Sequence, residues 1–158
     1  MFGGEIILVE VSEQAIINAS ANDVWKTIRT FDGVEKYLPM ISHSEVDGKG
    51  VGSTRTCTIS GIEGQGDSKA VEKLDYLNDD ERTISYSILE IPMPVKDMVN
   101  TVQIKDLGNS KSEIIWKSRF EPNGIPEDQA NKMIQDILLM AISGLKTLHE
   151  SPNSGDMA

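Results

Sequence analysis

The chain has 158 residues, of which 39% are hydrophobic and 25% charged, and these values predict one soluble globular domain with a sizeable core. Its formal net charge of -10 argues against nucleic acid or an anionic membrane as a partner, because both require a basic surface. Cys57 is the single cysteine and the histidines are far apart in sequence, so we expect no disulfide, no metal site and no cofactor. A cytoplasmic location fits this cysteine usage, and neither a signal peptide nor a membrane span is predicted.

The first part of the chain predicts a long strand and then two short helices. Apolar residues between positions 5 and 18 indicate the strand, and we expect a bulge at residues 12–14. Ser20 with Asp23 three residues later is close to a capping box, which predicts that a helix begins there. A second helical turn is predicted before Pro39, which would stop it.

The middle of the chain predicts six further strands separated by turn residues. Glycine-, asparagine- and aspartate-rich turns short enough for hairpins imply an antiparallel meander, and the absence of alternating strands and helices argues against a parallel sheet. The predicted strands cover residues 41–48, 50–61, 68–77, 82–91, 97–107 and 112–122.

The end of the chain predicts one long helix. Pro126 suits its first helical position, and His149 suits its C-terminal end as a cation. An apolar stripe at helical spacing consists of Ile134, Leu138, Ala141, Leu145 and Leu148. The fold class is therefore α+β: a curved seven-stranded antiparallel sheet wrapped around a long C-terminal helix, with residues 1–150 as one domain and 151–158 as a flexible tail.

Alternation along the strands predicts which side chains face the interior of the curved sheet. An apolar pocket with a few polar groups is the usual use of such an interior. The inward sets are Arg55, Cys57 and Ile59; Ile84, Tyr86 and Ile88; Met98, Asn100, Val102 and Ile104; and Ile114, Trp116, Ser118 and Phe120.

The order of elements and several short motifs resemble the SRPBCC superfamily, which includes START-like, pollen-allergen-like and polyketide cyclase/dehydrase-like proteins. The resemblance runs from about Ser12 to His149, and residues 21–39 look like the first helix and following turn of that family. It implies a helix-grip fold with an internal cavity for a hydrophobic ligand.

A more specific resemblance is to the abscisic acid receptor subgroup. "SGIEG", residues 60–64, sits where those receptors carry a gate loop, and "PMPV", residues 92–95, sits where they carry a latch. Ser42 occupies the position of the lysine that holds the hormone's carboxylate, and Glu63 replaces the gate proline. The latch histidine and arginine correspond to Met93 and Pro94. We therefore expect the fold of these receptors, but we do not expect abscisic acid to be the ligand.

Combining inward faces with this resemblance gives a candidate site. Glu72 aligns with a cavity glutamate of the receptors, and Ile62 would be the apolar plug of the gate. The candidate ligand-binding residues are Arg55, Cys57, Ile59, Ile62, Glu72, Tyr86, Ile88, Met93, Val95, Met98, Asn100, Trp116, Leu138 and Ala141.

Three functions remain open on this evidence. The first is binding of a small hydrophobic or amphipathic ligand, such as a lipid, isoprenoid or polyketide-like molecule. The second is a cyclase or dehydratase in which Glu72, with Arg55 or Tyr86, transfers protons. The third is a protein-interaction module that uses the gate and latch surface, and a weak homodimer is also left open. No catalytic residue is assigned, because no nucleophile motif accompanies His43 and Cys57 is expected to be a core residue.

Overall fold

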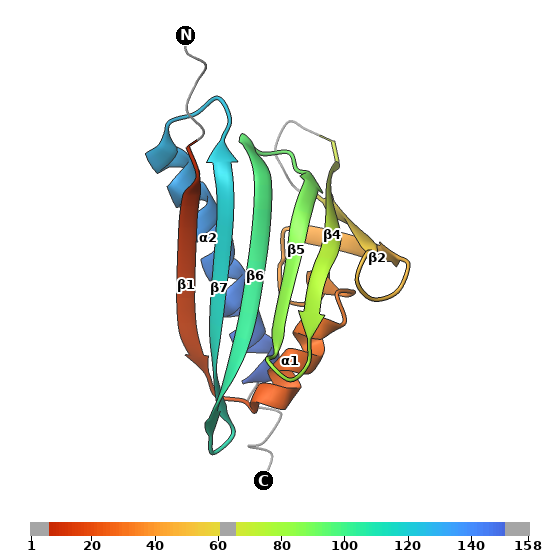
Figure 1. The fold of residues 1–158 in the computed structure, drawn as a ribbon, viewed down its shortest axis with the longest axis vertical. Helices are drawn as coiled ribbons and strands as arrows, with labels where there is room; N and C mark the ends of the chain where they lie inside the picture. Colours follow the sequence, from red (N-terminus) through yellow and green to blue (C-terminus); the bar gives the residue numbers. More distant parts are fainter. Residues whose placement is uncertain (1–6, 61–65, 151–158) are drawn as a thin grey trace.

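The computed structural model describes residues 7–60 and 66–150 and shows one antiparallel sheet with the strand order β1-β7-β6-β5-β4-β3-β2 (Figure 1). The predicted α+β helix-grip fold is confirmed. The strands are β1 (Val9–Ile17), β2 (Ile41–Asp47), β3 (Thr54–Ile59), β4 (Ser68–Asn78), β5 (Thr83–Glu90), β6 (Val95–Gly108) and β7 (Lys111–Pro122); the helices are α1 (Ala21–Arg29), η1 (Val34–Lys36) and α2 (Glu127–His149). The gate prediction at Ile62 and the tail prediction at 151–158 lie outside the described residues.

Helix α1 begins where its capping residue predicts. The Ser20 hydroxyl accepts a 3.1 Å hydrogen bond from the Asp23 backbone N–H. The helix ends at Arg29, and Phe31 adopts a left-handed backbone with φ 63°. The second helical turn is present but is only the single 3₁₀ turn η1, which follows Gly33 at φ 74°.

Strand β1 differs from the prediction in having no bulge. Its pairing with β7 runs unbroken from Val9 opposite Phe120 to Ile17 opposite Ser112. An extra residue in β1 would break this register, so the expectation at residues 12–14 was wrong. The irregularities on this side of the sheet lie instead in β6, where the register with β7 shifts between Lys96 and Val99 and again between Asp106 and Gly108.

Helix α2 lies along one face of the sheet and packs chiefly against β1 and β7 (Figure 1). The structure places Pro126 at the N-cap rather than at the first helical position. The apolar stripe is buried as far as Leu145, whereas Leu148 is 40% exposed and lies in a surface groove with Tyr37, Pro39 and Met140. None of the helices in residues 7–60 and 66–150 is long and apolar enough to cross a membrane.

Gly144 allows α2 to approach the chain just after η1. A Cβ atom at this position would lie 1.7 Å from the carbonyl oxygen of Tyr37 and 2.6 Å from its carbonyl carbon. Since both neighbours are backbone atoms, only glycine fits the observed spacing. This contact fixes the distance between α2 and the segment that carries Val34 and Leu38.

His149 joins α1 and α2 at the C-terminal end of α2, five residues after Gly144. Its Nε2 lies 2.9 Å from the Thr27 hydroxyl of α1. Burial lowers the pKa of this imidazole below its ordinary value of 6.5, although Asp23 acts in the opposite direction. The expectation of a helix-end cation is therefore wrong at neutral pH.

Candidate ligand-binding cavity

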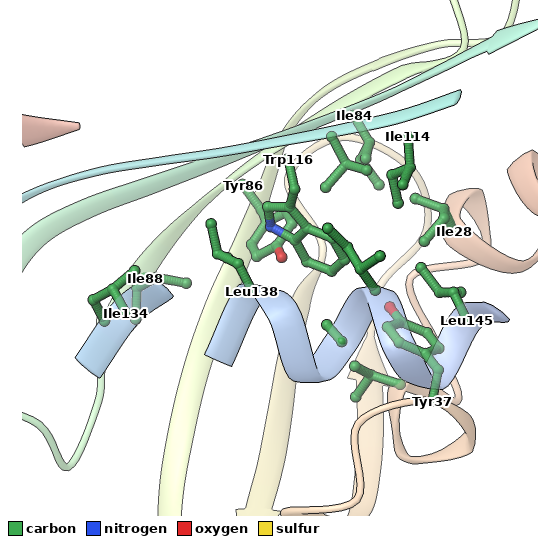
Figure 2. Packing of buried hydrophobic residues seen from close by; sticks show 14 of the residues in the cluster. Ile28, Tyr37, Ile84, Tyr86, Ile88, Ile114, Trp116, Ile134, Leu138 and Leu145 are labelled. Atoms are coloured by element: carbon green, nitrogen blue, oxygen red, sulfur yellow. The ribbon is translucent and has the colours of Figure 1, made fainter. Parts of the chain in front are cut away.

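An internal cavity of about 80 Å³ lies between the inner face of the sheet and α2. This is well above the roughly 10–15 Å³ that a cavity needs to hold one water molecule. Figure 2 shows Tyr86 and Trp116 projecting from the sheet toward Leu138 of α2. The lining residues are Val34, Leu38, Met40, Ile41, Arg55, Cys57, Ile59, Ala70, Glu72, Tyr86, Ile88, Ile91, Met93, Met98, Asn100, Trp116, Ser118, Ile134, Ile137, Leu138 and Ala141.

Most of the candidate site residues meet at this cavity. All the side chains that alternation placed inward on β3, β5, β6 and β7 are buried, as expected. Twelve of the candidates line the cavity: Arg55, Cys57, Ile59, Glu72, Tyr86, Ile88, Met93, Met98, Asn100, Trp116, Leu138 and Ala141. Their role in binding a ligand stays a prediction.

Two candidates are not among the lining residues. Val95 is buried in the core, but it pairs with Pro122 at the start of β6 and does not line the cavity. Ile62 lies outside the described residues.

A buried ion pair forms one wall of the cavity. Arg55 on β3 lies directly opposite Glu72 on β4, so both side chains point to the same face of the sheet. Arg55 Nε donates a 2.7 Å hydrogen bond to Glu72 Oε1, and a second guanidinium nitrogen contacts the same oxygen. The remaining terminal nitrogen donates a 2.9 Å bond to the backbone carbonyl of Phe31.

Two aromatic rings hold the guanidinium of Arg55 in place. Its Cζ lies 4.1 Å from the ring centroid of Phe31 and 5.1 Å from that of Tyr86. Burial disfavours the charge, but the Glu72 carboxylate outweighs this effect, so the pKa of Arg55 is raised. The arginine is therefore a fixed, charged part of the wall whose hydrogen bonds go to the protein itself.

The titratable side chains nearest this pair are kept neutral. Burial, reinforced by the Glu72 carboxylate, raises the pKa of Cys57 to about 12. The same two causes raise the pKa of Tyr86 well above its ordinary value. Cys57 is thus an unreactive core residue, as expected, and Tyr86 stays protonated across the physiological range.

A second polar cluster lies on β6 and β7. Asn100 and Ser118 are paired across the two strands, and Trp116 lies two residues along β7 on the same face. The Asn100 Oδ1, Trp116 Nε1 and Ser118 Oγ atoms are buried and have no hydrogen-bond partner in the part of the chain that the structure describes. We call these three residues the β6–β7 polar cluster.

Reasoning from sequence left several lining residues out of the candidate set. Three of them carry a signal in the sequence: Ser118 lies on the inward face of β7, Ala70 shares the face of Glu72, and Ile134 belongs to the stripe of α2. The wall formed by Val34 and Leu38 has no such signal, because these residues lie in and just after a 3₁₀ turn without a regular period.

Other motifs lie away from the cavity. His43 has a side chain that is 62% exposed and lies 3.4 Å from Glu45, as expected for a surface histidine. Ser42 is exposed and its hydroxyl contacts Ser60 and the Thr58 carbonyl. Within residues 7–60 and 66–150, no group of three histidine, cysteine or acidic side chains could hold a metal ion.

Comparison with known proteins agrees with this architecture. Abscisic acid receptor PYL2 from Arabidopsis thaliana is 26% identical over 137 residues, which cover 82% of this chain and 71% of the receptor. An uncharacterized protein from Bacillus thuringiensis has a solved structure with a TM-score of 0.80 and 25% identity, covering 90% of this chain and 100% of that one. The Zhui aromatase/cyclase from Streptomyces sp. R1128 shares the fold at a TM-score of 0.76 and 16% identity, covering 92% of this chain and 96% of that one.

The family profile described as "Polyketide cyclase / dehydrase and lipid transport" matches residues 9–150. This range includes every strand and helix described above and all the lining residues of the cavity. The chain therefore belongs to the polyketide cyclase/dehydrase and lipid transport family of the SRPBCC superfamily.

Proposed function

We propose that this protein binds a small hydrophobic or amphipathic ligand in the cavity between the sheet and α2. The observation that carries the proposal is a largely apolar cavity into which a few polar groups converge, the usual construction of a small-molecule site. The family's description and the names of its relatives, which include a hormone receptor and a cyclase, support a role for the same cavity.

The size of the cavity restricts what can enter without rearrangement. A volume of about 80 Å³ is small beside the roughly 300–1,000 Å³ of typical ligand pockets. Met40, Met93 and Met98 are part of the lining, and methionine side chains adapt readily to new shapes. A compact ligand fits the cavity as it stands, and a larger one requires these side chains to move.

Binding is favoured over the cyclase or dehydratase alternative by the state of its candidate acid and base. Oε1 of Glu72 accepts from Arg55, and the raised pKa of Tyr86 opposes its loss of a proton. A general acid or base works best with a pKa near the working pH, and the pKa of Tyr86 lies well above that range. The interaction-module alternative depends on Ile62, which lies outside the described residues.

The proposal is tested by mass spectrometry of protein purified without detergent. Native spectra should show a mass excess that disappears after extraction with organic solvent. Ala141→Leu, which adds bulk to the cavity wall, should reduce the excess, whereas Ser143→Leu on the exposed side of α2 should not. Protein that carries no ligand and does not bind the neutral probe N-phenyl-1-naphthylamine would contradict the proposal.

A further inference from the structure

We infer that the ligand carries an uncharged oxygen group, a carbonyl or a hydroxyl, which the β6–β7 polar cluster receives. The inference rests on the proposed binding function and adds the chemical class of the ligand. It also implies that carboxylates and ammonium ions are poor ligands, although an arginine and a glutamate lie in the cavity wall.

The polar cluster has the geometry of a receiving site. Asn100, Trp116 and Ser118 are 8%, 5% and 0% exposed, and all three line the cavity. They converge because the first and third are cross-strand partners and the second lies on the same face of β7. No protein group among residues 7–60 and 66–150 pairs with Asn100 Oδ1, Trp116 Nε1 or Ser118 Oγ.

The chemistry of these atoms fits a neutral oxygen. The indole N–H of Trp116 only donates, while the Ser118 hydroxyl and the Asn100 amide can both donate and accept. A ketone oxygen can accept from the donors, and an alcohol can also donate to an amide or hydroxyl oxygen. Unpaired buried polar groups are unfavourable, so a ligand that pairs with them gains affinity by removing that penalty.

The charges in the wall do not favour an ionic ligand. Arg55 is the one cation among the described lining residues, and its hydrogen bonds already go to Glu72 and to the Phe31 carbonyl. A carboxylate entering the cavity would lose its hydration without gaining a free cation, and it would meet the negative charge of Glu72. An ammonium ion would have to compete with Arg55 for that same carboxylate.

The test compares four eight-carbon ligands by isothermal titration calorimetry at neutral pH: 2-octanone, 1-octanol, octanoate and octylammonium. We expect the ketone and the alcohol to bind at least about tenfold more tightly than either ion. A tenfold ratio in affinity corresponds to about 1.4 kcal/mol, and burying a charged group without a partner costs at least this much. Octanoate or octylammonium binding as tightly as 2-octanone would overturn the inference while leaving the proposed function intact. Failure of all four to bind would instead contradict the proposed function.

Two serines on β7 provide a matched pair of variants. Ser118 and Ser112 are both 0% exposed with unpaired hydroxyls, but only the first lines the cavity. Both alanine variants should raise the melting temperature of the ligand-free protein, because each removes an unpaired buried hydroxyl. Only Ser118→Ala should weaken 2-octanone binding, by about two- to tenfold.

A third variant removes a donor without removing the ring. Trp116→Phe keeps most of the apolar surface and should weaken 2-octanone binding by a similar factor. Unchanged affinity for 2-octanone in folded Ser118→Ala and Trp116→Phe would overturn the inference, since the cluster would then serve only bound water. An equal loss of affinity in Ser112→Ala would overturn it as well, because the effect would not be specific to the cavity.

Discussion

Replacing Gly144 by alanine should destabilise the protein, although alanine is the better helix former. The new Cβ would lie 1.7 Å from the Tyr37 carbonyl oxygen, so about 1.7 Å of separation is needed to reach an ordinary 3.4 Å contact. Forcing packed backbone apart is an overpacking effect of about 3 kcal/mol, and the gain in helix propensity returns about 1 kcal/mol. The expected net loss is about 2 kcal/mol, or a fall of about 4–8 °C in melting temperature.

Urea and thermal unfolding followed by circular dichroism would measure this loss. Ser143→Ala is the control, because the neighbouring position is exposed on the same helix and gains propensity without the clash. We expect the control to be as stable as the parent or slightly more stable. A Gly144→Ala protein at least as stable as the parent would refute the inferred backbone contact.

Three other predictions concern buried or half-buried groups. Arg55→Met should lower the free energy of unfolding by about 3–5 kcal/mol, because it leaves Glu72 buried without its partner. The double variant Arg55→Met with Glu72→Leu should recover much of this loss in urea titrations. Equal losses in the single and the double variant would contradict the role of the ion pair. The pKa of His149 is lower in the folded protein than its ordinary 6.5, so stability should be complete above pH 6.5 and fall as the pH drops toward the folded value. His149→Gln should flatten this acid-side loss in melting curves, and an unchanged slope would show that another group is responsible. Cys57, with its pKa raised to about 12, should resist Ellman's reagent at pH 8 until urea unfolds the protein, and rapid labelling of the native state would show that the thiol is accessible.

The sequence predicted the inner surface of the sheet because strand alternation is a local property. Tyr86, Asn100 and Trp116 each lie within a run whose period of two is visible without knowing its neighbours. The same argument placed Arg55 inward, but the ion pair itself depends on the register between β3 and β4. Alternation within one strand does not determine this register, which depends on how the two strands pair.

Two expectations for α2, the charge of His149 and the burial of Leu148, were wrong because they depend on tertiary contacts. The charge of His149 was inferred from its place at a helix end, whereas the contact that buries it comes from Thr27, 122 residues away in sequence. Leu148 matches the helical period but lies in a surface groove beside Tyr37 and Pro39 and stays 40% exposed. Sequence periodicity indicates the apolar face of a helix, and only the packed structure shows where its cover ends.

The position of α2 divides the sheet into halves that should differ in hydrogen exchange. Because α2 packs chiefly on β1 and β7, the amides of these strands are expected to open only with global unfolding. The β2–β4 half faces the helix across the cavity and has fewer packed neighbours, so its amides should exchange through smaller local openings. A ligand bound between Glu72 on β4 and Leu138 on α2 would bridge the two halves of the sheet. Its binding should therefore slow the hydrogen exchange of amides in β3 and β4.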